Sequence, residues 1–102
     1  MKKVIDGKVY NTETATLVAE YDNGYYGGDF NKMEEALFKS PKGQFFLAGS
    51  GGPMSKYAER QGNTSSSGSG LTLLTEQEAL SWCEEVEIDA DVIADTFTVE
   101  EG

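Results

Sequence analysis

The net negative charge of this chain is confined to its last quarter. The 102-residue sequence has a formal net charge of −10. Residues 1–75 contain eight acidic and eight basic residues, whereas residues 76–102 contain ten acidic residues and no basic one. Like charges at this density oppose compaction unless they lie on the surface or meet a cationic partner. The sequence therefore predicts a neutral body, residues 1–75, that carries an anionic segment, residues 76–102.

The neutral body has the pattern of a small antiparallel sheet. Asp6-Gly7 between two short β-favouring runs is typical of a two-residue hairpin turn. Ser-Pro-Lys-Gly at 40–43 indicates a β-turn between residues 32–39 and 44–48, so we interpret these runs as a second hairpin, although 32–39 also fits a short helix. With further strands expected at 16–21 and 71–74, the last of them buried, the sequence predicts a sheet of about four to six strands.

Three stretches of the body are expected to be irregular. Residues 25–30 form an aromatic loop that begins with Tyr25 and Tyr26. Residues 54–60 fit either a short helix or an irregular crossing. The Ser- and Gly-rich run at 61–70 predicts a flexible loop.

The anionic segment begins with a strong helix signal. Thr75 followed by Glu78 is a capping box, in which each side chain accepts a hydrogen bond from the backbone of the other residue. The apolar residues that follow form one stripe, which predicts a helix packed on the sheet: Ala79, Leu80, Trp82, Cys83 and Val86. A second helical segment at 89–97 would turn Ile88, Val92, Ile93 and Phe97 inward. We therefore expect one α+β domain, residues 1–102, with a mainly β body and a helical C-terminal segment.

The sequence contains no complete motif for catalysis, metal binding or cofactor binding. The Gly-rich run at 49–56 lacks the spacing of a phosphate-binding loop. The acids at 89–100 match part of a calcium loop, but Ile93 and Ala94 replace the fifth ligand and the required Gly. The chain has no histidine, and Glu34-Glu35 are neighbours that point to opposite faces of a strand. We expect no catalytic residue, no metal and no cofactor; a small hydrolase is a minor alternative that requires perturbed carboxylates.

The charge predicts a protein partner rather than a nucleic acid. With a pI near 4.2 the chain repels a polyanion, which excludes direct nucleic-acid binding by its aromatic rings. An anionic helical surface instead resembles DNA and fits a basic surface of another protein. The expected partner-binding residues are Glu84, Glu85, Glu87, Asp89, Asp91, Asp95, Tyr25 and Tyr26. Two alternatives stay open: the acids only keep the protein soluble, or the chain is an adaptor that binds through its aromatic loop or a sheet edge.

The sequence also predicts a location. The positive start Met1-Lys2-Lys3 is followed by only two apolar residues, so no signal peptide or membrane segment is expected. A single cysteine, Cys83, fits a reducing compartment, and we expect a protein of the cytoplasm.

Three stretches resemble a group of short proteins from phages and mobile elements. They are residues 5–15, residues 46–53 with Tyr57-Ala58, and residues 73–79, and the resemblance extends over about residues 3–85. Small size, acidity and this mobile-element context are typical of anti-CRISPR proteins, which block a CRISPR nuclease or its target-binding complex. The resemblance implies a stoichiometric inhibitor in a bacterial host cell and supplies no catalytic residue.

Overall fold

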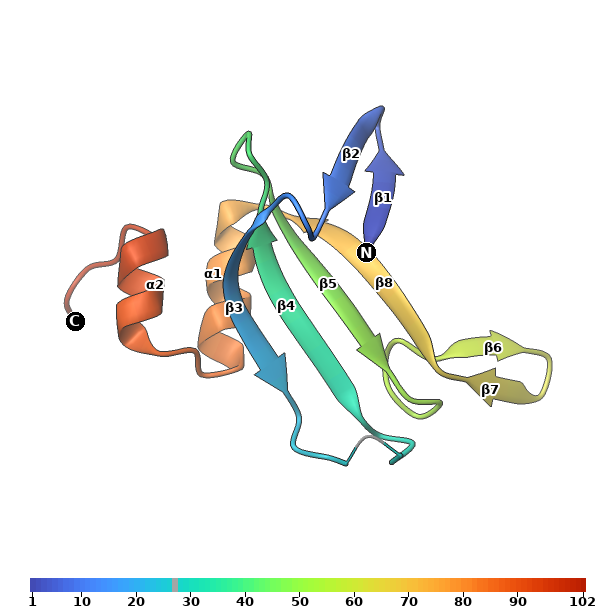
Figure 1. Cartoon of the computed structure of the whole chain (residues 1–102). Coiled ribbons are helices and arrows are strands. Elements are labelled where there is room, and N and C mark those ends of the chain that lie inside the picture. The colour runs from blue at the N-terminus through green and yellow to red at the C-terminus, as the bar shows by residue number, and fades with distance from the viewer. Residues whose placement is uncertain (27) are drawn as a thin grey trace.

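The computed structural model describes residues 1–26 and 28–102 and has an α+β fold (Figure 1). Gly27, in the predicted aromatic loop, lies outside the described residues. The elements in chain order are β1 (Lys2–Ile5), β2 (Lys8–Asn11), β3 (Thr16–Asp22), β4 (Met33–Lys39), β5 (Phe45–Gly51), β6 (Glu59–Gln61), β7 (Thr64–Ser66), β8 (Gly68–Leu74), α1 (Glu76–Glu85) and α2 (Ala90–Thr96).

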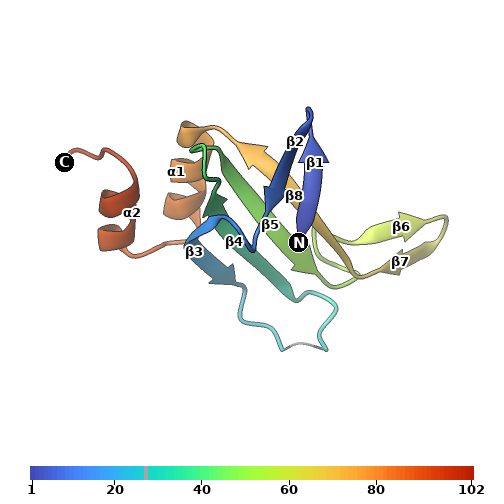
Figure 2. The ribbon, with the colours of Figure 1, turned by 45° about the horizontal axis from the view of Figure 1, so that its top comes forward.

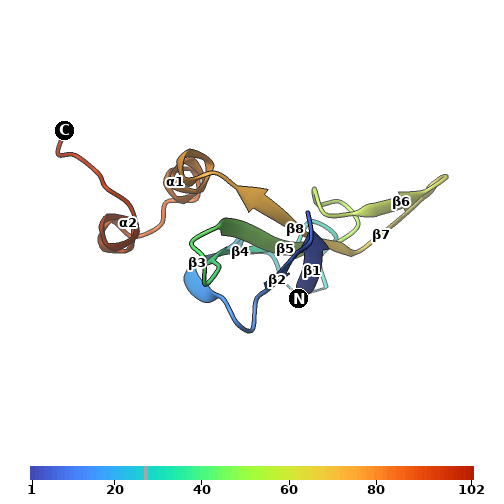
Figure 3. The same cartoon turned by 90° about the horizontal axis from the view of Figure 1, so that it is seen from above.

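The centre of the fold is a four-stranded antiparallel sheet in the order β3-β4-β5-β8. Both predicted hairpins are present: β1 pairs with β2 across Asp6-Gly7, which both have positive φ, and β4 pairs with β5. The helices cover one face of the sheet, and the β1–β2 hairpin lies on the other (Figures 2 and 3). The prediction of an antiparallel sheet with a C-terminal helix packed on it is confirmed.

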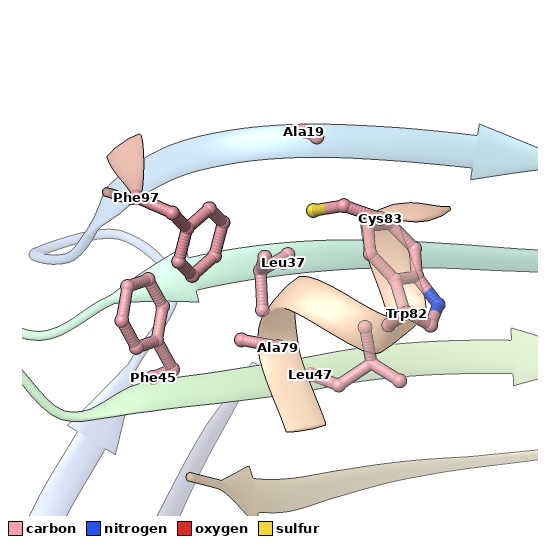
Figure 4. Packing of buried hydrophobic residues seen from close by; sticks show 8 residues of the cluster. All are labelled: Ala19, Leu37, Phe45, Leu47, Ala79, Trp82, Cys83 and Phe97. Carbon is pink, nitrogen blue, oxygen red and sulfur yellow. The ribbon is translucent and has the colours of Figure 1, made fainter. Parts of the chain in front are cut away.

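Each face of the sheet has its own hydrophobic core. On the helix face, Leu37, Phe45 and Leu47 of the strands pack against α1 and the residue that ends α2 (Figure 4). That residue, Phe97, stacks on Phe45 with ring centroids 5.2 Å apart. On the opposite face, Tyr10 of β2 packs against Phe46 and Leu71. Figure 4 shows Trp82 and Cys83 of α1 directed at the sheet, as the sequence predicts.

The expected flexible loop at 61–70 is instead ordered as strands. Residues 59–66 form the β6–β7 hairpin, and β8 already begins at Gly68. Gly62 adopts a φ of 61°, which allows the chain to reverse between β6 and β7. The adjacent Ser and Thr residues are compatible with a strand, so the composition of the run misled the prediction. Residues 54–58 form turns and no helix, which leaves the irregular crossing as the correct alternative.

Candidate protein-binding surface

The start of α1 is fixed by the predicted capping box. The Glu78 backbone N–H donates to Thr75 Oγ1 at 3.1 Å, and the Thr75 N–H donates to Glu78 Oε1 at 2.9 Å. Ala79, Trp82 and Cys83 on the inner side of the helix are buried. Burial of apolar surface therefore holds α1 on the sheet and leaves its acidic side in solvent.

A buried carboxylate adds a polar anchor beneath α1. Glu35 on β4 is only 4% exposed, and its carboxylate accepts hydrogen bonds from three side chains of two other segments. Trp82 Nε1 donates to Oε1 at 3.1 Å, while the Tyr57 hydroxyl at 2.5 Å and Lys56 Nζ at 2.8 Å donate to Oε2. The Glu35 carboxylate thus joins the sheet, the loop before β6 and α1.

The ionised form of Glu35 is the stable one in the folded chain. Burial alone would raise the pKa of this carboxyl group, but the hydrogen bonds from Lys56, Tyr57 and Trp82 outweigh burial and lower the pKa below its usual value. Burial and the hydrogen bond to Glu35 raise the pKa of the Tyr57 hydroxyl, so Tyr57 remains a donor. All three donors are occupied by one carboxylate, which gives Glu35 a structural role. The preceding residue, Glu34, is exposed instead.

The acidic residues at the end of α1 occupy unfavourable positions. Glu84 and Glu85 lie in the last helical turn, where the helix dipole favours cations, and no basic residue is present in that turn. Glu87 follows with a φ of 58°. Its N–H bonds to the Glu84 carbonyl and the Ile88 N–H bonds to the Cys83 carbonyl, a Schellman motif in which Glu87 holds the position that glycine usually occupies.

The second helix presents two acids on one outer face. Asp89 is the N-cap of α2, and its carboxylate accepts the Asp91 N–H at 2.8 Å. Val92 and Ile93 are half-buried against the core, as predicted, and Phe97 is buried. Asp91 and Asp95 are four residues apart and therefore lie within about 40° of each other around the helix axis. Both are exposed.

Among the described residues, none of the predicted acidic contact residues forms an ion pair. The six residues are all exposed: Glu84, Glu85, Glu87, Asp89, Asp91 and Asp95. Within residues 1–26 and 28–102, the ion pairs join Lys32 to Asp22 and Glu34, and Lys56 to Glu35, so they all lie outside the anionic segment. The described residues contain no group of acids, Cys or His arranged to hold a metal ion. The acidic surface is therefore unneutralised within the chain.

The two predicted aromatic contact residues lie elsewhere. Tyr25 is 48% and Tyr26 is 91% exposed, in the loop between β3 and β4. Figure 1 shows this loop at one end of the sheet, away from α2. Two residues that sequence reasoning did not select, Phe30 and Met54, are also exposed, and the Met54 N–H bonds to the Phe30 carbonyl at 2.8 Å. The predicted residues thus form two separate surfaces, one acidic and one aromatic.

Neither helix of the described chain has the length and apolar character needed to cross a membrane.

Comparisons of the chain with protein-family models, with curated proteins and with solved structures gave no match.

Proposed function

We propose that this protein is a non-enzymatic inhibitor that binds a basic, nucleic-acid-binding surface of a protein partner through its acidic C-terminal segment. The contact residues lie at the end of α1, in the turn that follows and on the outer face of α2. The partner class is a CRISPR effector or one of its subunits, which the resemblance to proteins of phages and mobile elements favours. A bacterial cytoplasm is the corresponding location.

The observation that supports this proposal is that the acids at the end of α1 reduce the stability of the fold. Glu84 and Glu85 each oppose the helix dipole by about 0.3–1 kcal/mol. Glu87 adds roughly 1 kcal/mol because a side chain is strained in the left-handed region. Residues that break local rules without a structural gain are expected at functional sites. Solubility alone would not require acids at these particular positions.

The mean charge density along α1 is close to that of a single nucleic-acid strand. The helix α1 has ten residues, of which four are acidic: Glu76, Glu78, Glu84 and Glu85. At a rise of about 1.5 Å per residue, this is one charge per about 4 Å. One strand of DNA has one charge per about 3.4 Å, and the duplex has one per about 1.7 Å. The four acids lie in two pairs at the two ends of α1, so the helix matches one phosphate backbone in mean charge density and not in regular spacing.

The test is competition for target DNA. Purified CRISPR effector complexes of several types, each loaded with its guide RNA, are mixed with labelled target DNA and increasing amounts of this protein. We expect loss of the DNA complex for one type, at a one-to-one ratio with the effector. The inhibition should weaken steeply between about 50 and 200 mM salt, because binding releases counterions. Unchanged DNA binding for every type tested would contradict the CRISPR assignment.

The exposed aromatic surface supports a second candidate function. Aromatic residues and Met are enriched at protein interfaces, and Tyr26, Phe30 and Met54 are all more than 60% exposed. An adaptor that binds through these side chains would lose its partner on Tyr26→Ala and Phe30→Ala. It would keep the partner when Glu84 and Glu85 are changed to Lys. The acidic inhibitor would give the opposite pattern.

A further inference from the structure

The two edges of the central sheet differ in how they are protected. A free strand edge exposes unpaired N–H and C=O groups and invites pairing with another chain. The β3 edge has a β-bulge between Leu17 and Ala19, and it carries two exposed acids, Glu20 and Asp22. Bulges and charges are the usual means of blocking such pairing. The β3 edge is therefore protected.

The β8 edge has none of these protections. Its seven residues, Gly-Ser-Gly-Leu-Thr-Leu-Leu, include no charge and no proline, and they pair with β5 residue by residue without a bulge. In the part of the chain that the structure describes, no strand pairs with the outer side of β8. At its beginning, the Tyr57 carbonyl and the Glu59 side chain lie against one face of Gly68. Residues 69–74 are thus uncharged and, among the described residues, have no strand partner on their outer side.

We propose that β8 pairs with β8 of a second copy of this chain, antiparallel, to form a continuous eight-stranded sheet. An antiparallel pair of identical strands is self-complementary about a twofold axis. With the axis at Thr72, Leu71 of one copy lies opposite Leu73 of the other. Leu71 and Leu73 both belong to the core that Tyr10 and Phe46 form, so this register extends that core across the interface. Thr72 would face Thr72 of the second copy, a favourable cross-strand pair.

The charge distribution favours a second copy at this edge. Figure 1 shows α2 and the end of α1 toward the β3 side of the sheet, although α1 begins directly after β8 and contacts β5 and β8. Pairing through β8 therefore places the proposed contact residues 84–95 of the two copies on opposite sides of the joined sheet, whereas Glu76 and Glu78 stay near the shared strands. Screening over about 8 Å at physiological salt makes the repulsion between the two sets of contact residues small at that separation. Pairing through β3 would instead bring the two acidic segments together.

The test compares two lysine substitutions on the two edges. Thr72→Lys places like charges directly opposite each other in the proposed dimer, whereas Thr16→Lys makes the same change on the protected β3 edge. Both threonines are exposed, and both variants change the net charge equally. Sedimentation equilibrium at about 0.15 M salt should show a dimer for the wild type and for Thr16→Lys. The dissociation constant of Thr72→Lys should be about fivefold higher. Circular dichroism and thermal unfolding confirm that each variant folds.

Amide hydrogen exchange locates the contact independently of any variant. In the wild type, protection at residues 69–74 should rise with protein concentration, and in Thr72→Lys it should not. A wild-type monomer at all concentrations would overturn the proposal. A dimer that Thr72→Lys leaves intact would also overturn it, because the interface would then lie elsewhere. Pairing through β8 leaves the acidic segment free, so its failure would not affect the proposed function.

Discussion

Removal of the Glu35 carboxylate should loosen α1 from the sheet. In Glu35→Ala, Trp82 Nε1 and the Tyr57 hydroxyl lose their buried acceptor. A hydrogen bond to a charged group contributes about 1.5–3 kcal/mol, and a buried donor left unpaired is costly. The pair with Lys56 contributes less, about 0.2–1 kcal/mol, because the Lys56 side chain is 58% exposed. We therefore expect Glu35→Ala to lower the free energy of unfolding by about 3–5 kcal/mol.

Glu35→Gln is the milder, matched variant. Its amide oxygen can accept from Trp82 and its amide nitrogen can donate to the Tyr57 hydroxyl oxygen, so the charge, the Lys56 pair and the acceptor of the Tyr57 O–H are lost. We expect a loss of about 1–2 kcal/mol at neutral pH. Urea unfolding measures both variants, with the fluorescence of Trp82 as the signal. Trp82 is the only tryptophan of the chain and touches the site directly.

The pH dependence of the Glu35→Gln effect tests the cause. The folded state lowers the pKa of Glu35, so ionisation of this group stabilises the fold above its unfolded pKa of about 4.3. That stability is lost as the pH falls through the folded pKa. The difference between wild type and Glu35→Gln should therefore be constant from pH 6 to 8 and shrink below about pH 4. A difference that does not change with pH, or a loss below 1 kcal/mol for Glu35→Ala, would refute the anchoring role of the charged carboxylate.

Substitutions at three further places test local features of the fold by thermal or urea unfolding. Gly49→Ala should destabilise the fold by about 2 kcal/mol or more, because the new Cβ would lie 2.1 Å from the Tyr57 ring. Gly70→Ala is the control, since its Cβ would lie 3.8 Å from Tyr57 atoms, and it should change stability by less than about 1 kcal/mol. Equal effects of the two substitutions would contradict the close packing of Tyr57 on β5. Glu87→Gly should stabilise the fold by about 1 kcal/mol, because glycine adopts the left-handed backbone at the end of α1 without strain. A lower Tm would show that the Glu87 side chain makes a contact that outweighs this strain. Thr75→Ala should cost about 1 kcal/mol through loss of the capping box, and Thr75→Ser should recover most of it; no loss in the alanine variant would show that the cap is not needed.

Local signals in the sequence identified most elements of the fold. Asp6-Gly7, the turn at 40–43 and the capping box of Thr75 each act over a few residues, so they can be recognised without knowledge of the rest of the chain. The amphipathic stripe of α1 likewise placed Trp82 and Cys83 in the core. The run at 61–70 was misread because its composition is that of a linker, whereas its pairing depends on the turn at Gly62 and on the distant partner strand β5.

The role of Glu35 could not be read from the sequence. Glu35 and Trp82 are 47 residues apart, and Glu34-Glu35 has the appearance of two solvated acids. The strand register decides which of the two is buried, because neighbours on β4 face opposite sides of the sheet. The proposed acidic contact residues could be selected from the sequence because the proposal depends on their charge. Their unfavourable backbone positions, Glu87 above all, became visible only in the structure.

Charge reversal at the end of α1 tests the central claim most directly. Glu84→Lys with Glu85→Lys removes acidic contacts but improves the interaction with the helix dipole, so the Tm should stay constant or rise. The control, Glu13→Lys with Glu20→Lys, makes the same change in net charge at two exposed acids of the neutral body. In the target-DNA competition assay we expect the control to inhibit like the wild type and the α1 variant to lose inhibition at least about tenfold. Full inhibition by a folded Glu84→Lys, Glu85→Lys variant would contradict the acidic segment as the binding surface.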